Sequence, residues 1–354
     1  MLDLALYHPE HGFYGRGGGA GRDGDFLTSP EVGPLFGAVV ANALDAWWRE
    51  LGEPDPYVVV EAGAGAGTLA RDVLAAAPAC APALRYVLVE RSDVLREHQR
   101  DRLRLEPARQ VLGPVVHGPD PEEGVHAVPG IGPLATSLAE LPQGPLTGVV
   151  LANELLDNLA FRLLENTPYG WAEVSVTENL SELLVPAAPE PAEEAGRLAP
   201  VAPTGGRIPL QHAARAWLRS ALGVVERGRV VVFDYVDTTP SLARRPWTEW
   251  LRTYRRHGRG GHPLDRLGEQ DVTCEVAVDQ LHAARPPSVD RTQAEFLRDN
   301  GVDNLVADAR RRWEERAHIG DLEAVKHRSR VTEADALIDP EGLGAFRVLE
   351  WPVS

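Results

Sequence analysis

Short apolar runs alternate with amphipathic stretches through much of the chain. Runs of four to six mostly apolar residues lie at 57–60, 86–89, 148–152 and 229–234. Such runs are typical of strands that are buried on both faces of a sheet. Apolar residues recur at helical spacing at 68–77 and again from Ser92 onward. Strands and helices that alternate in this way predict parallel βαβ units, and therefore an α/β fold with a doubly wound, mostly parallel sheet.

The segments on either side of this core carry other patterns. Residues 7–25 contain many glycines, which predicts a loop and not a regular element. Ser29 and Pro30 then suit the start of an amphipathic helix that ends near Gly52. The C-terminal third has strand-like patterns at 272–278 and 345–351, with helical patterns at 293–300, 303–316 and 321–330 between them. Residues 120–133 are rich in glycine and proline and fit neither type.

An insertion separates the strands at 148–152 and 229–234. Alternating residues around Tyr169 and Gly170 predict a hairpin. The stretch 186–206 is proline-rich and poor in aromatic residues, which predicts an exposed linker or mobile loop. We therefore expect an N-terminal glycine-rich lid and helix (1–53), a core with C-terminal additions (54–160 and 207–354), and a hairpin and linker insertion (161–206).

The composition excludes several classes of protein. The 36 Lys and Arg residues against 52 Asp and Glu residues give a net charge of −16. This balance argues against nucleic acid or an anionic membrane as partner, and favours a cationic substrate. The single lysine, Lys326, does not follow a glycine-rich loop, so P-loop ATPases and GTPases are excluded. Cys80 and Cys274 form no CxxC pair and no HExxH occurs, so no metal site is predicted.

The chain shows no sign of membrane insertion. It contains no run of about 18 apolar residues. The segment from Met1 onward also lacks the charged head and apolar stretch of a signal peptide. Together with two isolated cysteines, these features predict a protein of the reducing cytoplasm.

The clearest chemical motif follows the strand at 57–60. From Glu61 to Thr68 the sequence reads EAGAGAGT, in which glycines let the backbone approach a ligand and the next helix offers free N–H groups. A dinucleotide fingerprint needs glycine where Thr68 stands. A carboxylate at Glu61 repels a pyrophosphate but attracts the ammonium of S-adenosyl-L-methionine. Glu90, at the end of the next strand, suits two ribose hydroxyls.

We therefore expect this edge of the sheet to bind S-adenosyl-L-methionine. The residues assigned to the cofactor are Glu61, Gly63, Gly65, Gly67, Thr68 and Glu90. Two simpler interpretations stay open. The glycines also suit a plain strand-to-helix turn, and Glu90 also suits a helix cap.

A second polar group follows the strand at 148–152. Because ligands bind beyond the carboxyl ends of parallel strands, Asn153, Glu154 and Asp157 are expected on the same edge as the glycine loop. We assign these three residues to the orientation of the acceptor in catalysis. The alternative is that Asn153 or Asp157 only caps a helix.

A third group lies near the N-terminus. We place Tyr14, Asp25, Thr28 and Ser29 in a lid over the cofactor, since glycine-rich flanks permit closure. Helix capping explains Ser29 equally well. It leaves Asp25 and the long glycine tract without a role.

These motifs together resemble one family. The matching segments are 5–9 (ALYHP), 12–14 (GFY), 24–37 (GDFLTSPEVGPLFG), 60–74 (VEAGAGAGTLARDVL), 88–99 (LVERSDVLREHQ), 151–162 (LANELLDNLAFR), 268–281 (GEQDVTCEVAVDQL), 293–297 (QAEFL) and 337–351 (LIDPEGLGAFRVLEW). In this order they resemble the MidA-like class I methyltransferases, which include the mitochondrial complex I assembly-factor arginine methyltransferase. Members usually have proline and arginine at the positions of Ala64 and Ala66, and AHVD at 274–277. Members also have a helix before the ALYHP block, which predicts a natural start upstream of Met1.

The resemblance implies a Rossmann-like sheet of seven strands that binds S-adenosyl-L-methionine, with an inserted substrate-recognition region. It also implies a protein arginine as methyl acceptor and a subunit of respiratory complex I as partner. A guanidinium stays charged and matches carboxylates such as Glu154 and Asp157. We therefore predict a methyltransferase that works by in-line displacement. The alternatives are a cofactor-binding assembly factor with weak or no transfer activity, and a nucleotide-dependent oxidoreductase. The oligomeric state is not predicted.

Overall fold

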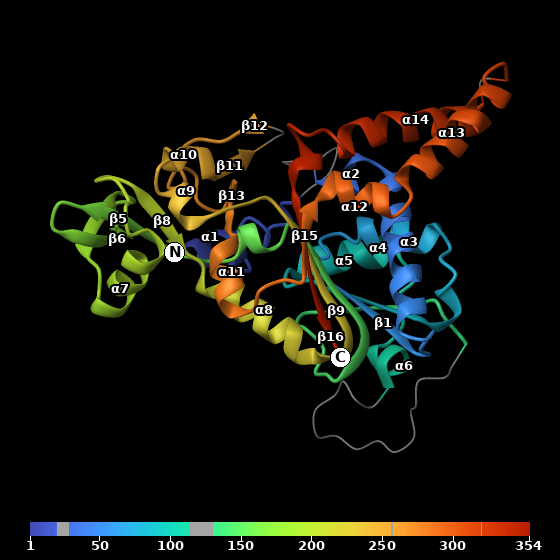
Figure 1. Ribbon diagram of the computed structural model, residues 1–354, viewed down its shortest axis with the longest axis horizontal. Coiled ribbons are helices and arrows are strands. Elements are labelled where there is room, and N and C mark those ends of the chain that lie inside the picture. Colours follow the sequence, from blue (N-terminus) through green and yellow to red (C-terminus); the bar gives the residue numbers. More distant parts are fainter. Residues whose placement is uncertain (20–27, 114–129, 256–257, 320) are drawn as a thin grey trace.

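A seven-stranded sheet forms the centre of the protein (Figure 1). The computed structural model describes residues 1–19, 28–113, 130–255, 258–319 and 321–354. Within this sheet the order is β15-β16-β9-β4-β1-β2-β3, and only β16 runs antiparallel to its neighbours. The strands are β1 (Tyr57–Ala62), β2 (Leu84–Val89), β3 (Leu134–Leu138), β4 (Leu146–Asn153), β9 (Val225–Asp234), β15 (Val289–Thr292) and β16 (Arg347–Val353). The predicted α/β fold with a doubly wound, mostly parallel sheet is confirmed.

Helices cover both faces of this sheet. β1 is buried along its whole length, with Val59 in one hydrophobic core and Val58 and Val60 in the other. Each valine buried in this way stabilises the fold by about 1.5–3 kcal/mol. Figure 1 shows α3 and α4 on one side and α8 and α11 on the other. The helices around the sheet are α3 (Pro34–Glu50), α4 (Thr68–Ala75), α5 (Asp93–Arg102), α6 (Ala108–Leu112), α8 (His212–Val224), α11 (Val278–Ala284) and α12 (Gln293–Asp299), with 3-10 turns at Ala81–Ala83, Leu156–Asn158 and Leu343–Ala345.

The helix expected from Pro30 to near Gly52 is interrupted, so that prediction was wrong. A short α2 (Ser29–Val32) is followed by Gly33 in extended conformation, and Pro34 starts α3. A proline disfavours helical geometry in the residue before it. The carboxylate of Glu333 fills the space at the break and accepts a hydrogen bond from the Leu35 N–H (3.0 Å). Before this region, α1 (Leu2–Tyr7) precedes the glycine-rich segment.

The insertion is more ordered than its composition indicates. The predicted hairpin is present as β5 (Arg162–Thr167) and β6 (Gly170–Val176), which join β7 (Glu182–Pro186) and β8 (Arg207–Leu210) in a sheet ordered β7-β6-β5-β8. The stretch 186–206 is not a linker, because it contains α7 (Pro189–Leu198). Proline suits the first turn of this helix, and Ala195 and Ala199 pack against Leu164 and Ile208.

Two smaller sheets follow the insertion. They are β10 (Val236–Asp237) with β14 (Val276–Ala277), and β12 (Gly258–Arg259), β11 (Leu251–Arg255) and β13 (Asp271–Cys274), near α9 (Thr239–Leu242) and α10 (Trp247–Trp250). The strand expected at 272–278 is therefore divided. Residues 271–274 pair with β11, whereas 276–277 pair with β10. Glu275 lies between the two sheets, where its N–H donates to the Trp250 carbonyl (2.9 Å) and its carboxylate pairs with Arg245 and Arg252.

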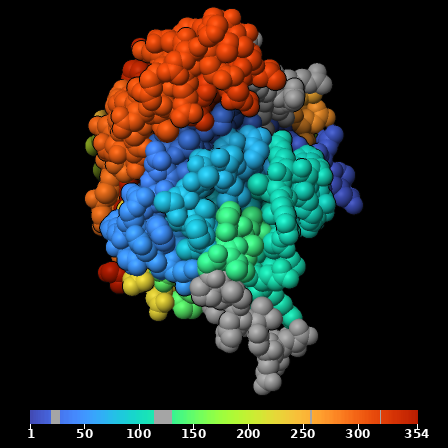
Figure 2. Space-filling view, turned by 90° about the vertical axis from the view of Figure 1, so that its right-hand side faces the viewer, coloured from blue at the N-terminus to red at the C-terminus, as the bar shows by residue number. Residues whose placement is uncertain are grey.

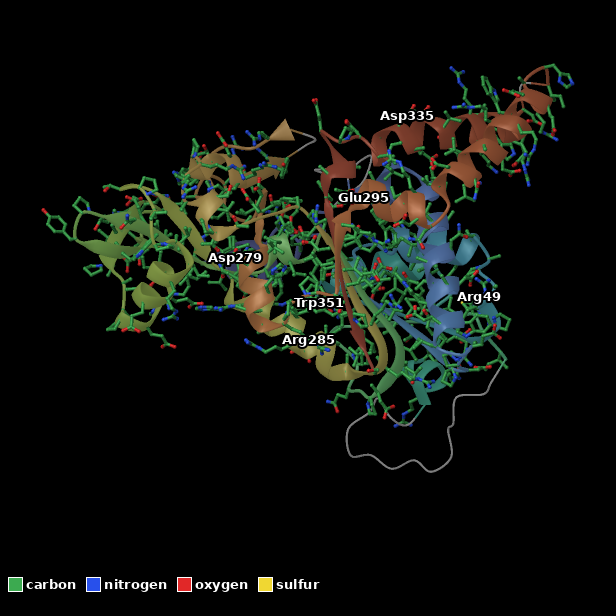
Figure 3. All side chains as sticks on the ribbon, in the orientation of Figure 1. Arg49, Asp279, Arg285, Glu295, Asp335 and Trp351 are labelled. Atoms are coloured by element: carbon green, nitrogen blue, oxygen red, sulfur yellow. The ribbon has the colours of Figure 1, made fainter. Side chains whose placement is uncertain are left out.

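The C-terminal helices form a projecting hairpin. α13 (Val302–Arg316) and α14 (Leu322–Leu337) pack side by side, and Figure 2 shows them above the blue helix α3. α14 continues beyond the predicted 321–330 because its last turns, with Ala334 and Leu337, are buried against the core. The final strand β16 places Trp351 in the interior, where its indole N–H donates to the Arg285 carbonyl at 2.8 Å (Figure 3).

Two expectations lie wholly or largely outside the described residues. Asp25 is one, and most of the glycine- and proline-rich stretch 120–133 is the other. Among the residues that are described, no helix combines the length and the apolar character needed to cross a bilayer.

Candidate functional site

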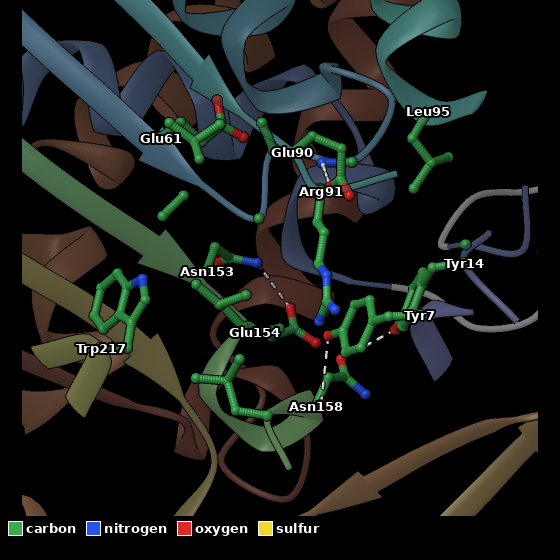
Figure 4. A pocket seen from close by; sticks show the side chains of 18 of the residues that line it. Tyr7, Tyr14, Glu61, Glu90, Arg91, Leu95, Asn153, Glu154, Asn158 and Trp217 are labelled. Atoms are coloured by element: carbon green, nitrogen blue, oxygen red, sulfur yellow. Dashed lines mark hydrogen bonds between the residues drawn. The ribbon is translucent and has the colours of Figure 1, made fainter. Parts of the chain in front are cut away.

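A cavity of about 600 Å³ opens at the carboxyl ends of β1, β2 and β4. Its volume lies within the range of cofactor pockets. The wall is built from distant segments: α1, the start of α2, the loop after β1, the turns after β2, β3 and β4, and α8. Figure 4 shows that the polar side chains gather where these strands end. The predicted edge of the sheet therefore borders a single cavity.

The glycine loop after β1 needs all three glycines for their backbone conformation, and two of them also because of close neighbours. Gly63, Gly65 and Gly67 all have positive φ (70, 51 and 82°). A Cβ at Gly63 would lie 2.9 Å from Leu155, and one at Gly67 would lie 3.1 Å from Leu88. At Gly65 nothing lies within 4 Å, and this residue lines the cavity. Gly65 is thus the position where the backbone is open to a ligand.

A buried amide holds this loop in place. The side-chain N–H of Gln99 donates to the Gly65 carbonyl (2.7 Å), and its oxygen accepts from the Ser137 hydroxyl (2.5 Å). Gln99 is fully buried on α5. Sequence reasoning missed it, although it lies inside the quoted block 88–99. Its support leaves the loop backbone fixed before any ligand arrives.

Glu61 and Glu90 both line the cavity, as predicted from their places at strand ends. Glu61 accepts a hydrogen bond from the Tyr86 hydroxyl (2.7 Å), and burial raises its pKa to about 8. Glu90 accepts from the N–H groups of Gly65 (3.0 Å) and Ser92 (2.8 Å). Burial raises the pKa of Glu90 as well, and these two bonds oppose that rise. Glu90 therefore joins the glycine loop to the end of β2.

Of the residues assigned to the start of α4 and to the lid, some line the cavity and others do not. Thr68 lines the cavity, but its hydroxyl donates to Glu31 (2.6 Å) and accepts from Arg102 (2.9 Å). Thr28 also lines the cavity, as the residue before α2. Ser29 lies behind it, where its hydroxyl donates to the Gln293 side chain (3.0 Å). The capping region of α2 thus contributes Thr28 to the wall.

Tyr14, the fourth lid residue, is part of a fixed polar cluster. Its hydroxyl lies 3.1 Å from Asn158 Oδ1 and 3.0 Å from Asp271 Oδ1, and it can donate a hydrogen bond to either oxygen. Its ring stacks on Tyr7 with centroids 5.4 Å apart. Burial, together with the charge of Asp157, raises the pKa of Asp271 to about 7. Tyr7, Asn158 and Asp271 were not predicted as site residues, since each acts only through contacts with distant segments.

Asn153 and Glu154 lie together on the cavity wall (Figure 4). The Asn153 amide (3.1 Å) and the Ser29 N–H (3.1 Å) both donate to Oε1 of Glu154. Glu154 adopts a left-handed backbone conformation (φ 50°), which costs a non-glycine residue about 1–3 kcal/mol. Burial, and then the charge of Asp157, raises the pKa of Glu154 to about 8. Strain of this kind is typical of positions that serve a function.

Asp157 does not share this wall. The 3-10 turn after Glu154 carries it behind the cavity, where it is buried and accepts a hydrogen bond from the Tyr235 hydroxyl. Burial raises its pKa to about 6. The structure therefore places Asn153 and Glu154 together on the cavity wall, whereas Asp157 is buried and is not part of that wall. In the part of the chain described, no His, Cys, Asp and Glu side chains are grouped so as to hold a metal ion.

The chain is similar to several known proteins. Residues 39–288 match the model of a family of S-adenosyl-L-methionine-dependent methyltransferases. The protein arginine methyltransferase NDUFAF7 homolog, mitochondrial, of Drosophila melanogaster is 35% identical over 173 residues, which are 48% of this chain and 39% of that protein. Protein arginine methyltransferase NDUFAF7, mitochondrial, of Mus musculus is 30% identical over 332 residues, which are 84% of this chain and 69% of that protein. The aligned part thus spans well under half of the Drosophila relative.

One solved structure is similar along almost the whole chain. It is a protein from Burkholderia thailandensis, described as a likely methyl transferase, with S-adenosyl-homocysteine bound. The two proteins are 25% identical with a TM-score of 0.77, and the match covers 99% of this chain and 86% of that one. The likeness therefore includes the insertion and the C-terminal additions as well as the central sheet.

Proposed function

We propose that this chain, which belongs to the family of S-adenosyl-L-methionine-dependent methyltransferases, transfers a methyl group from that cofactor to a protein arginine side chain. One observation carries the proposal. A single cavity has the open glycine loop with Glu61 and Glu90 on one part of its wall, and Asn153 with Glu154 on another. The names of the two curated relatives support arginine as the acceptor.

The residues of this cavity fit the cofactor. Gly65 leaves open space for a close approach to the backbone. The carboxyl of Glu90 lies on the same wall and suits ribose hydroxyls. Glu61, largely protonated when the cavity is empty, becomes a partner for an ammonium once it ionises. When bound, S-adenosyl-L-methionine supplies a methyl group on a positively charged sulfur.

The acceptor is assigned to the part of the wall that holds Glu154. Asn153 and Ser29 fix one oxygen of this carboxyl, so the other is presented in a defined direction. The nitrogen that gains a methyl group has to lose a proton. A carboxyl that titrates near neutral pH suits that transfer. Asp157 acts only as a positioning residue, because its charge contributes to the raised pKa of Glu154.

A second function is a cofactor-binding assembly factor with weak or no transfer activity. It is favoured by Ala64 and Ala66, which stand where family members usually have proline and arginine. The family match argues against the nucleotide-dependent oxidoreductase. The resemblance extends the proposal to a subunit of respiratory complex I as partner. Both cysteines are free and buried, which supports a reducing compartment such as the cytoplasm.

Three measurements test the proposal in sequence. Calorimetry is expected to show micromolar binding of S-adenosylhomocysteine and none of NAD, and the opposite pattern would exclude a methyltransferase. Transfer of a labelled methyl group into lysate proteins, with the label found on arginine, separates an enzyme from an assembly factor. Glu154→Gln is expected to lower turnover at saturating cofactor, whereas Glu226→Gln, an exposed control on β9, leaves it unchanged. Equal turnover in both variants would refute the role of Glu154.

A further inference from the structure

One end of the cavity already holds a guanidinium group. Arg91 follows the cofactor-side residue Glu90, and its side chain extends into the cavity toward Tyr7 and Glu154 (Figure 4). Its guanidinium carbon lies 4.8 Å from the centre of the Tyr7 ring. Its Nη1 donates to Asp3 Oδ1 at 2.7 Å. An aromatic face and a carboxylate are the surroundings that a planar cation prefers.

The platform under this guanidinium is firmly held. Tyr7 stacks on Tyr14, whose hydroxyl reaches Asn158 and Asp271. The Tyr7 hydroxyl itself lies 3.4 Å from the Asn158 carbonyl, to which it donates. The three hydrogen bonds join Tyr7 and Tyr14 to segments more than 140 residues away. The aromatic face is therefore fixed by the fold and does not depend on Arg91.

The occupant, by contrast, is loosely held. The side chains of Arg91 and Asp3 are 59% and 52% exposed, and exposed ion pairs contribute little to stability. Arg91 also points toward the carboxyl of Glu154 (Figure 4). Within the described ranges no basic side chain forms an ion pair with Glu154, whose Oε1 accepts hydrogen bonds from the Ser29 N–H and the Asn153 amide.

We propose that Tyr7, Asp3 and Glu154 bound a guanidinium subsite, and that Arg91 occupies it until the arginine of a substrate displaces it. The inference rests on the proposed function and names the chemistry of its acceptor subsite. Tyr7 is then a specificity-determining residue, since a flat guanidinium stacks on an aromatic face better than a compact ammonium does. Arg91 acts as a built-in competitor that keeps small cations out of the site.

Binding of a small probe tests this without knowledge of the natural acceptor. Protein saturated with S-adenosylhomocysteine is titrated with ethylguanidinium, and separately with ethylammonium, by ligand-observed NMR. An occupant held by one exposed ion pair and one cation–π contact fills the subsite roughly five-sixths of the time, so Arg91→Ala is expected to tighten ethylguanidinium binding about sixfold. Arg100→Ala is the matched control, because Arg100 is exposed on the same chain segment, pairs with Glu97 and does not line the cavity.

Further variants examine the platform. In the Arg91→Ala background, Tyr7→Phe is expected to keep the probe and Tyr7→Leu to weaken it about tenfold. Ethylammonium is expected to bind more weakly than ethylguanidinium in every variant with an aromatic residue at position 7. Equal binding by wild type and Arg91→Ala, no binding by either, or no preference for ethylguanidinium would overturn the inference. The proposed function fails separately, by loss of S-adenosylhomocysteine binding in the wild-type protein.

Discussion

Gly65→Ala separates the binding role of the glycine loop from its role in folding. Gly65 has φ 51° and no atom within 4 Å of an added Cβ. Gly52, after the end of α3, has φ 81° and the same open surroundings, but it lies outside the cavity. Alanine at either position adopts the same disfavoured backbone conformation. Gly52→Ala is therefore a matched control for the backbone cost.

The expected magnitudes follow from this geometry. Left-handed backbone costs alanine about 1–2 kcal/mol at either position. A chain of this length unfolds with an entropy of about 0.7 kcal/mol per kelvin, so both variants are expected to lose about 1.5–3 °C in Tm. Only the Cβ at residue 65 meets a cofactor. Overpacking of about 1–3 kcal/mol there weakens binding roughly 5- to 150-fold.

Calorimetry with S-adenosylhomocysteine and thermal unfolding of both variants provide the test. The expected result is equal loss of Tm, with loss of affinity in Gly65→Ala alone. If Gly65→Ala bound the ligand as tightly as the wild type, the loop would not approach the cofactor. If Gly52→Ala lost affinity to the same extent, the effect would come from general destabilisation.

Three further changes probe the loop, the buried acids and the insertion. Burial raises the pKa of Glu61 from 4.5 to about 8. Between pH 4.5 and about pH 8, Glu61 is therefore protonated in the folded state and ionised in the unfolded state. Stability therefore falls as pH rises through that window, and Glu61→Gln should make the fall shallower by up to about 1.4 kcal/mol per pH unit in urea unfolding; an unchanged slope would contradict the burial argument. Gln99→Leu leaves the Gly65 carbonyl and the Ser137 hydroxyl unpaired. It should lower Tm and weaken S-adenosylhomocysteine binding, at a cost of about 1–3 kcal/mol, whereas the exposed Gln110→Leu should do neither. Ala195→Glu puts a charge between α7 and its sheet. Limited proteolysis should then cut 161–206 faster, while cofactor binding persists. Equal cleavage in Ala195→Glu and in the exposed control Glu193→Ala would restore the linker interpretation.

The elements that were predicted correctly are those that form because of their own residues and immediate neighbours in the sequence. The apolar runs of β1, β2, β4 and β9 need no distant information, because both faces of each strand are buried. The prediction for 186–206 was wrong because the composition of this segment is typical of disordered chains, whereas its helix depends on the packing of Ala195 against Leu164 and Ile208. The break at Gly33 had a local signal in Pro34, which the pattern of apolar residues concealed.

The same distinction applies to the site. Glu61, Glu90, Asn153 and Glu154 follow from the rule that strand ends share one edge of a sheet. Asp157 does not, since the 3-10 turn that rotates it away is set by packing. The stacking of Tyr7 on Tyr14 and the contacts that hold this pair could not be predicted from the sequence either. The Tyr14–Asp271 contact joins residues that are 257 positions apart, and nothing in either segment indicates the other.

The cavity also changes the meaning of the net charge of −16. Burial raises the pKa of Glu61 and Glu154 to about 8 and that of Asp271 to about 7. At neutral pH these acids are largely or partly protonated, so the site carries less negative charge than its sequence indicates. A cation that enters lowers the pKa of the carboxyl beside it and drives ionisation there. Negative charge thus develops where a cation binds, and a neutral molecule of similar shape gains no such interaction. This ionisation favours a sulfonium cofactor and a guanidinium acceptor in one cavity, without the cost of burying several uncompensated charges in the empty protein.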